Sequence, residues 1–230
     1  MTKINVIIPA FNEQESIVKV LNDIPENMVQ EVIVVNNNST DLTASVAEQA
    51  GVTVLDEPRR GYGQACLAGL NYLSMKTSQP DIVVFMDADY SDHPDELPRV
   101  VQPILENGKD LVIGARVKKW REKGSMTPPQ VFGNWLATRL MKLIYGSRFT
   151  DLGPFRAIRY DRLLDLKMQD TNFGWTVEMQ IKALRQKLDY TEVPVHYRNR
   201  IGVSKISGTF KGTLLAGYKI LTLIFKYSFR

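Results

Sequence analysis

The sequence predicts an α/β fold with a mostly parallel sheet flanked by helices. Over residues 4–116, short runs of apolar and β-branched residues alternate with longer amphipathic segments, which is typical of a doubly wound parallel sheet. One run, at residues 82–86, is apolar at every position, as expected of a strand buried on both faces. Polar residues follow these runs directly, at the strand ends where ligands bind in open α/β sheets.

The composition fits one folded domain, or one domain with a small appendage. The chain has 230 residues, of which 44% are hydrophobic and 23% are charged, which is enough for a substantial core. Cys66 is its only cysteine, so an intramolecular disulfide and a cysteine-rich zinc site are excluded. The sequence shows no signal peptide and no long uncharged apolar stretch, so we expect no transmembrane helix.

Charge is distributed unevenly along the chain. The formal net charge is +4, but after Glu192 there are seven bases and no acid, so the preceding residues hold 22 bases and 25 acids. A basic tail on an acidic body indicates a polyanionic partner, which is a phosphate compound, an anionic lipid or a nucleic acid.

The first two strands carry polar residues at their carboxyl ends. Residues 4–8 form the first strand, which Pro9 ends because proline cannot donate to a central ladder. Asn12 and Glu13 follow at a helix start, where they contact a nucleotide or cap the helix. Residues 31–35 form the second strand, and the six polar residues after it are more than a turn needs.

The alternation then continues through a glycine-containing helix start. Gly61-Tyr62-Gly63 opens a helix, and glycines and arginines at such a position can hold phosphate. Their spacing does not match a dinucleotide fingerprint, and the absence of a P-loop sequence argues against a P-loop nucleotidase. The expected elements around this motif are a helix from residues 39–41 to about 50, a strand at 52–55, and a helix from 57–65 to about 75.

Asp87 and Asp89 directly follow the central apolar run. Because they are two apart, their side chains point to opposite faces of the strand if it stays extended. Two such carboxylates repel each other unless a cation is present, and a hard divalent ion that also binds substrate phosphates is the natural partner. The alternative is a polar cap on the next helix, since Ser91, Asp92 and Pro94 suit a helix start. The pattern alone leaves both interpretations open.

The second half of the chain is less regular. Glu178 lies early in an expected helix, where a carboxylate interacts favourably with the helix dipole. The expected elements are a helix over 94–105, a strand at 110–114 that delivers Arg116, a mobile loop over 118–129, a helix over 132–144, a short strand after Gly153-Pro154, a helix from 172 to about 187, and a strand over 190–197 that Pro194 places at an edge.

The C-terminal region is basic throughout. Residues 198–208 form either a phosphate-gripping loop or a flexible surface loop, and residues 209–230 have a helical period. A basic amphipathic helix fits a membrane surface, and it also fits packing on its own domain or on a partner; we favour membrane contact. One expected stripe holds Lys211, Lys219, Thr222 and Lys226, and another holds Leu214, Tyr218, Leu221 and Phe225.

Four motifs together resemble family-2 glycosyltransferases, in particular the branch of dolichol-phosphate mannose and glucose synthases and their bacterial polyprenyl-phosphate relatives. The resemblance covers nearly the whole chain and implies a Rossmann-like GT-A fold. The motifs are Ile8-Pro9-Ala10-Phe11-Asn12-Glu13, Asn38-Ser39-Thr40-Asp41, Met86-Asp87-Ala88-Asp89 with His93-Pro94-Asp95-Glu96, and Arg200-Ile201-Gly202-Val203-Ser204-Lys205.

The resemblance also implies a division of the chain and roles for particular residues. A glycosyltransferase domain would cover 1–208, with a nucleotide-sugar half at 1–116 and an acceptor half at 117–208, followed by the amphipathic helix at 209–230. Asp87, Asp89 and Ser91 would hold Mg²⁺ or Mn²⁺, and the catalytic residues would be Asp89, Arg116 and Glu178. A UDP- or GDP-hexose would be bound by Pro9, Ala10, Phe11, Asn12, Glu13, Asn36, Asn38, Asp41, Gly61, Asp87, Ala88, Arg200 and Lys205.

The sequence departs from the family pattern at several of these places. The loop usually written V-D-D-G-S-T-D reads V-N-N-N-S-T-D over residues 35–41, which removes two acids near the donor and leaves the base open. Ser91 stands where glutamine is frequent. Gln130 and Asn134 stand where arginine and serine are frequent in the acceptor region.

The implied reaction is an inverting transfer of glucose or mannose to a polyprenyl or dolichyl phosphate, by a cytoplasmic enzyme on the inner face of the membrane. A lipid phosphate is largely anionic at pH 7, because its second pKa is about 6, and needs no strong base. A soluble hydroxyl acceptor is the alternative, and it would need a base such as Glu178. We expect no nucleic-acid binding, since the tail has no recognised motif and the strand-end acids would be unexplained.

Overall fold

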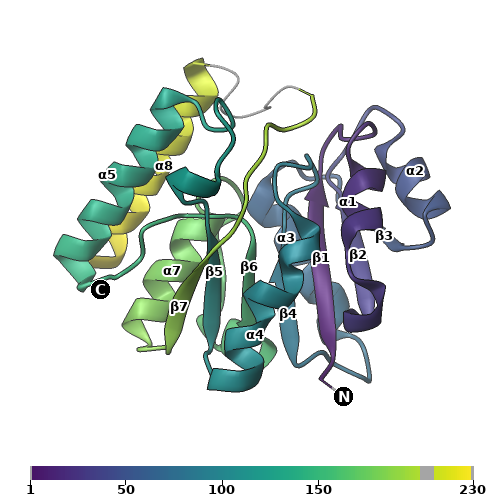
Figure 1. Cartoon of the computed structure of the whole chain (residues 1–230), viewed down its shortest axis with the longest axis horizontal. Coiled ribbons are helices and arrows are strands. Elements are labelled where there is room, and N and C mark those ends of the chain that lie inside the picture. Colours follow the sequence, from purple (N-terminus) through teal and green to yellow (C-terminus); the bar gives the residue numbers. More distant parts are fainter. Residues whose placement is uncertain (1, 203–209, 229–230) are drawn as a thin grey trace.

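The computed structural model describes residues 2–202 and 210–228, with side chains in the last helix described from residue 215. These residues form one seven-stranded sheet with helices on both faces (Figure 1). The strands are β1 (Ile4–Ala10), β2 (Glu31–Asn36), β3 (Thr53–Asp56), β4 (Ile82–Phe85), β5 (Leu111–Ala115), β6 (Arg156–Arg159) and β7 (Tyr190–Pro194). The α-helices are α1 (Ile17–Asp23), α2 (Thr43–Gln49), α3 (Tyr62–Ser74), α4 (Leu97–Asn107), α5 (Pro128–Tyr145), α6 (Tyr160–Leu166), α7 (Trp175–Arg185) and α8 (Phe210–Ser228). Short 3-10 helices are η1 (Glu26–Met28), η2 (Pro94–Glu96) and η3 (Lys118–Trp120).

The strand order is β3-β2-β1-β4-β6-β5-β7, and every strand is parallel to its neighbours except β6. This confirms the mostly parallel sheet. The strand expected after Gly153-Pro154 is β6, and it runs antiparallel between β4 and β5. β7 lies at the edge of the sheet, as Pro194 predicts.

Two hydrophobic layers cover the sheet. Alternate residues of each strand point to opposite faces, so Ile7 joins one layer while Val6 and Ile8 join the other. Helices α3 and α5 to α8 cover the face of Ile7, and α1, α2 and α4 cover the opposite face. Phe85 and Trp175 meet edge to face at 5.8 Å within the first layer. Polar loops follow the carboxyl ends of β1, β2 and β4.

The structure differs from the sequence prediction at one strand boundary and in one added helix. Strand β1 continues through Pro9 to Ala10. Its pairing with β4 stops at Ile7, so at Pro9 the strand pairs with β2 alone and proline is tolerated as it is on an edge. Helix α6 follows β6 without a break and was not expected.

The expected loop over 118–129 contains ordered structure at both ends. It includes η3, and α5 begins at Pro128, four residues before the predicted start at residue 132. Proline suits the first helical turn because its missing N–H has no partner there. The Thr127 N–H donates to the Gln130 side chain at 2.7 Å, which fixes this helix start.

Helix α8 packs against α5 and α7. Leu223, Ile224 and Tyr227 face the core, whereas Tyr218 and Phe225 are exposed. The apolar stripe expected to hold Tyr218 and Phe225 is therefore not the buried side of the helix. The side chains of Lys211 and Leu214 lie outside the described residues. Among the described helices, none has the length and apolar character needed to cross a membrane.

Candidate active site

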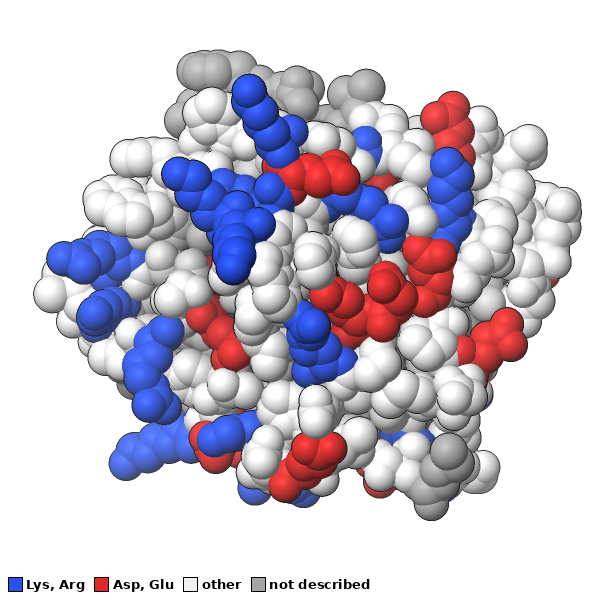
Figure 2. All heavy atoms as spheres, viewed as in Figure 1, with Lys and Arg blue, Asp and Glu red and all other residues white. Residues whose placement is uncertain are grey.

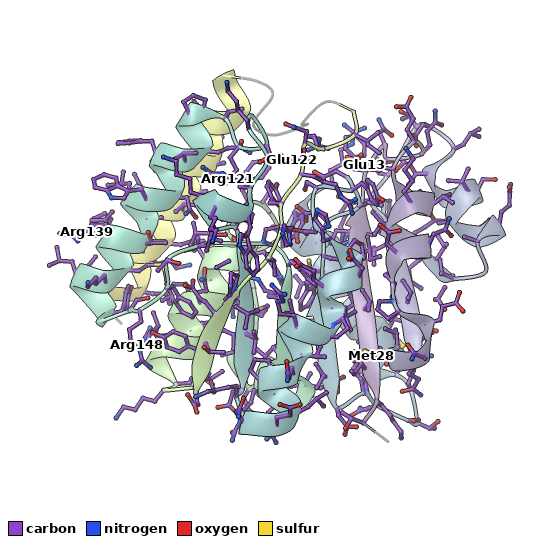
Figure 3. All side chains as sticks on the ribbon, in the orientation of Figure 1. Glu13, Met28, Arg121, Glu122, Arg139 and Arg148 are labelled. Carbon is purple, nitrogen blue, oxygen red and sulfur yellow. The ribbon has the colours of Figure 1, made fainter. Side chains whose placement is uncertain are left out.

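A cavity of about 330 Å³ opens at the carboxyl ends of β1, β2 and β4. Figure 3 shows Glu13 at this upper end of the sheet. The lining contains nine of the residues predicted from the sequence and five that were not predicted. The nine are Pro9, Ala10, Phe11, Glu13, Gly61, Asp87, Ala88, Asp89 and Arg200, and the five are Asn37, Arg60, Tyr62, Asn172 and Phe173.

Asp87 and Asp89 form the acidic floor of this cavity. The Oδ1 atom of Asp87 is shielded from solvent and makes no hydrogen bond of normal geometry among the described residues, although the nearby Tyr62 hydroxyl acts to lower the pKa of this carboxyl group. Burial and the nearby charge of Asp89 raise the pKa of Asp87 to about 7. Asp89 accepts hydrogen bonds at Oδ1 from the N–H (2.9 Å) and hydroxyl (2.5 Å) of Ser91. Ser91 therefore orients the Asp89 carboxylate in this structure.

A guanidinium group lies between the acids of two strand ends. Arg200 Nη2 donates to Glu13 at 2.7 Å, and Arg200 Nη1 lies 3.0 Å from Asp89 Oδ2. The site therefore already accommodates a positive charge against Asp89, and the unpartnered oxygen of Asp87 is a second oxygen ligand that a cation could use. Carboxylate oxygens of this kind suit a hard divalent cation. No group of three or more His, Cys, Asp or Glu side chains within the described residues is arranged to hold a metal.

Four predicted donor residues shape the loops around the cavity and are not among its lining residues. Asn12 and Asn38 adopt positive φ values of 53° and 61°, which asparagine tolerates better than most residues. Asn12 Oδ1 accepts the Thr40 N–H at 2.8 Å, which joins the loop after β1 to the loop after β2. Asn36 and Asp41 also bond to neighbouring loop and strand residues. These side chains hold the cavity wall in place.

Asn37 lines the cavity, although nothing in the sequence distinguishes it from its neighbours. Its side chain donates to the carbonyls of Glu57 (3.2 Å) and Arg59 (2.8 Å) and accepts the Gly61 N–H at 2.7 Å. It thereby fixes the segment that carries Arg60, whose guanidinium lies 4.7 Å from the Phe11 ring centroid. A planar group stacked beside this pair would meet both an aromatic face and a positive charge.

Asn172 and Phe173 come from a distant part of the chain. The N–H groups of Gly63 and Gln64, at the start of α3, donate to the carbonyls of Asn172 (3.2 Å) and Thr171 (2.9 Å). A Cβ at Gly63 would lie 2.0 Å from the Asp170 carbonyl oxygen, so only glycine permits this approach. The sequence predicts a phosphate site at Gly61 and Gly63; in the structure Gly63 makes this close contact and Gly61 lines the cavity.

Asp92 is a buried acid that the sequence indicated only as a helix cap. Its Oδ2 accepts the Asp87 N–H at 3.2 Å, and its Oδ1 has no partner among the described residues. Burial, followed by the charges of Asp87 and Asp89, raises its pKa well above the usual value. Three carboxyl groups therefore meet around one strand end.

Arg116 lies beside this acidic group but is already paired. It makes two side-chain hydrogen bonds to Asp151 at 2.7 and 2.8 Å, and its own N–H adds a third at 2.8 Å. Its guanidinium lies 5.1 Å from the Tyr197 ring centroid. Arg116 is not among the residues lining the cavity. The predicted contact of Arg116 with an acceptor phosphate would therefore lie outside this cavity.

Glu178 is deeply buried on α7, with a residue exposure of 1%. Its carboxylate accepts hydrogen bonds from the N–H groups of Gln169 and Asp170 and from the Tyr227 hydroxyl, and it pairs with Lys182 at 2.8 Å. It does not line the cavity at the strand ends. In this structure it connects the segment before α7 to α8. Lys205, the other predicted donor residue, lies outside the described residues.

The chain is similar to several glycosyltransferases in sequence. It is 35% identical to an uncharacterised glycosyltransferase of Mycobacterium tuberculosis (strain H37Rv), over 93% of this chain and 94% of that protein. It is 30% identical to an undecaprenyl-phosphate mannosyltransferase of Micrococcus luteus, over 90% and 88% of the two chains.

The fold is also similar to that of solved structures. Glucosyl-3-phosphoglycerate synthase from Mycobacterium tuberculosis, in complex with Mn²⁺, UDP and glucosyl-3-phosphoglycerate, matches with a TM-score of 0.78 at 21% identity, over 98% of this chain and 80% of that chain. This likeness supports the GT-A fold. A family model described as glycosyl transferase family 2 matches residues 5–166. The chain belongs to glycosyl transferase family 2.

Proposed function

We propose that this enzyme transfers a hexose, glucose or mannose, from UDP-hexose or GDP-hexose to a polyprenyl or dolichyl phosphate, with inversion and with Mg²⁺ or Mn²⁺. The observation that carries the donor site is the cavity in which two strand-end aspartates face Phe11, Arg60 and Arg200. It combines a surface for a planar base with positive and acidic groups for a metal-bound diphosphate.

The residues present fit a divalent cation. Asp87 supplies an unpartnered oxygen, and Asp89 already faces the Arg200 guanidinium. When bound there, the cation would neutralise charge on the diphosphate and so favour its departure. Ser91 orients the Asp89 carboxylate. The Mn²⁺ in the structurally similar glucosyl-3-phosphoglycerate synthase complex supports this assignment.

The chain's own groups then position the donor. Phe11 and Arg60 would bind the base, and Arg200 would exchange its contacts with Glu13 and Asp89 for the diphosphate, where developing charge is stabilised by a fixed cation. Lys205, which lies outside the described residues, would add a second charge to this closure. Arg116 would act near the acceptor phosphate.

The acceptor assignment rests on chemistry and on relatives. A lipid phosphate brings its own negative oxygen, so positioning replaces proton removal. A hydroxyl acceptor needs a base, and the nearest sequence-based candidate, Glu178, has its carboxylate occupied by four donor groups. The undecaprenyl-phosphate mannosyltransferase of Micrococcus luteus supports the phosphate acceptor. We place the enzyme on the cytoplasmic face of a membrane, in contact through residues 209–230.

A soluble acceptor is the second candidate. It is favoured by the structural likeness to glucosyl-3-phosphoglycerate synthase, whose complex holds glucosyl-3-phosphoglycerate. That acceptor class would use the same donor cavity and would not require membrane contact.

The two candidates are separated by measuring donor turnover with a panel of sugar nucleotides and Mn²⁺, with and without a short polyprenyl phosphate in detergent. We expect transfer only when the lipid phosphate is present. Equal turnover on 3-phosphoglycerate without lipid would overturn the lipid acceptor and retain the donor site. Absence of any metal-dependent nucleotide binding would overturn the donor site itself.

A further inference from the structure

Exposed apolar side chains gather on one layer of the molecule. Eleven large apolar side chains are exposed among those the structure describes, and seven lie on α5 or α8. The other four lie on separate elements. The seven are Val131, Phe132, Trp135, Leu143, Leu215, Tyr218 and Phe225. Since the two helices pack side by side at one margin of the molecule (Figure 1), this layer stands out from the rest of the surface.

The outward side of α5 combines this apolar surface with positive charge. Phe132, Trp135, Arg139, Lys142 and Leu143 recur at helical spacing and are all exposed; we call these five residues the α5 face. Trp135 is 57% exposed and Leu143 is 82% exposed. The rings of Phe132 and Trp135 lie 5.9 Å apart, so they form one aromatic patch.

No acid balances these bases on either helix. Residues 128–145 and 210–228 contain no Asp or Glu. Figure 3 shows Arg139 projecting from the outer margin of α5, and in Figure 2 the outermost left margin, where this helix lies, carries blue but no red atoms. Lys226 on α8 is also exposed. A partner of this layer must therefore accept aromatic and aliphatic groups and be negatively charged.

We propose that the α5 face docks on an anionic lipid bilayer and that α5, as well as the C-terminal helix, holds the enzyme on the membrane. Aromatic side chains are favoured at the bilayer interface, and the long stems of arginine and lysine let their charges reach lipid phosphates while apolar neighbours insert. This inference rests on the proposed lipid acceptor only for its choice of a membrane as partner.

A second copy of the chain fits the α5 face less well. A two-fold contact would bring Arg139 and Lys142 of one copy towards the same residues of the other, or towards Lys226, without an acid from either helix. Like charges would then be desolvated together. Anionic headgroups instead neutralise each of them.

The α5 face also lies next to the segment that pairs with Arg116. Asn134, in the same helical turn as Phe132 and Trp135, accepts the Leu152 N–H at 2.9 Å and donates to the Thr150 carbonyl. Asp151, which lies between Thr150 and Leu152 in the chain, accepts a hydrogen bond from the Arg116 guanidinium. Docking through this turn brings the bilayer surface to the segment that carries the proposed acceptor arginine.

The test is vesicle co-sedimentation of the full chain without donor or acceptor, using phosphatidylcholine vesicles with and without phosphatidylglycerol. We expect binding that depends on phosphatidylglycerol and weakens with salt. The double variant Phe132→Ala with Trp135→Ala should bind about tenfold more weakly or worse, because both side chains lose their insertion. The control, Leu42→Ala with Met75→Ala, removes side chains that are 64% and 71% exposed elsewhere and should bind normally.

The charges are tested separately. Arg139→Gln with Lys142→Gln should remove most of the preference for phosphatidylglycerol, whereas Lys3→Gln with Lys19→Gln, at exposed sites outside α5 and α8, should retain it. Equal binding by the Phe132 and Trp135 variant and its control would overturn the proposal. So would light scattering that shows a wild-type dimer converted to a monomer by this variant, since the face would then be a self-interface.

Failure of the proposed membrane docking can be distinguished from failure of the proposed transfer reaction. Transfer to a short polyprenyl phosphate in detergent is measured on the same variants, and the double aromatic variant should retain it because its changes lie outside the donor cavity. Normal lipid transfer in detergent without wild-type vesicle binding would overturn the docking face and leave the reaction standing.

Discussion

The donor edge of the sheet and the α5–α8 layer differ in how their polar and apolar residues are arranged. At the donor edge, acids and amides are largely shielded and are held by hydrogen bonds between loops, as for Asn37 with the Glu57–Gly61 segment. On α5 and α8, apolar rings and bases point outwards without acidic partners on the same helices. The first arrangement suits the fixed geometry that the proposed donor site needs, and the second suits the proposed docking surface.

Among the described residues, the two regions meet at the segment before α7. The segment 170–174 touches the start of α3 on one side, and Lys219 of α8 pairs with Asp170 at 2.9 Å on the other. Gly174 lies close to Leu223 of α8 as well. The wall of the donor cavity that contains Asn172 and Phe173 is therefore supported by the C-terminal helix. The following variants test how far the regions depend on each other.

The largest effect is expected at Asp89. Replacing it by asparagine removes the carboxylate charge while retaining similar shape, so metal-dependent donor turnover should fall by about a thousandfold. Turnover and calorimetric binding of UDP with Mn²⁺ measure this. Asp161→Asn, at an exposed ion pair with Arg159, is the control and should behave as wild type. Undiminished Mn²⁺-dependent binding in Asp89→Asn would contradict the metal assignment.

Gly63→Ala should break the contact between the regions. The new methyl group would overlap the Asp170 carbonyl, so the segment before α7 must shift, at a cost of about 3 kcal/mol in unfolding free energy. Donor affinity should fall with it because Asn172 and Phe173 move. Urea unfolding and nucleotide titration report the two effects.

The matched control is Gly133→Ala on α5. No atom lies within 4 Å of a Cβ at this position, so alanine should be neutral or stabilise the helix by about 0.5–1 kcal/mol. If both alanine variants unfold alike, steric contact at Gly63 is not what joins the two regions.

Many residues at the donor edge could be predicted, because they directly follow strands that the sequence pattern identifies clearly. Asp87 and Asp89 follow an uninterrupted apolar run, and Phe11 and Glu13 follow the first strand. Asn37 could not be distinguished from Asn36 and Asn38 in the sequence, because its position in the cavity wall depends on its hydrogen bonds to the 57–61 segment. Side-chain direction in such a loop is set by backbone geometry that composition does not reveal.

Contributions from distant segments were harder to predict. Phe173 reaches the cavity through backbone contacts with α3, more than a hundred residues earlier in the chain. The antiparallel position of β6 likewise depends on non-local pairing with β4 and β5. In α8, several apolar stripes compete in the sequence, and packing on α5 and α7 selects the one that includes Leu223 and Tyr227.

Glu178→Gln separates a positioning role from a catalytic one. The amide cannot satisfy all the donors that the carboxylate accepts, so unfolding free energy should fall by about 1–3 kcal/mol. Transfer to a polyprenyl phosphate should change by less than about tenfold, whereas loss of a general base costs about 10²- to 10⁴-fold. Tyr227→Phe, which removes one donor only, should cost about 1 kcal/mol. A hundredfold loss of kcat with unchanged stability would instead identify Glu178 as a base.

The smallest effect is expected from Glu57, which helps hold the Arg60 segment. Hydrogen bonds from the Arg59 side chain, the largest cause, lower the pKa of Glu57 to about 2 from its ordinary 4.5. A lowered pKa in the folded state stabilises the protein above the ordinary value, and this stabilisation is lost as pH falls from about 4.5 towards 2. Glu57→Gln should therefore be less stable than wild type at neutral pH, and the difference should shrink in acid.

Urea unfolding of both proteins at several pH values measures that difference, with Glu15→Gln at an exposed position as control. We expect a modest effect because Arg59 is exposed and solvent screens its charge. A gap between wild type and Glu57→Gln that stays constant across the acid range would mean that hydrogen-bond geometry, rather than charge, holds this loop. In that case added salt should leave the gap unchanged as well, whereas a charge-based contribution should weaken with salt.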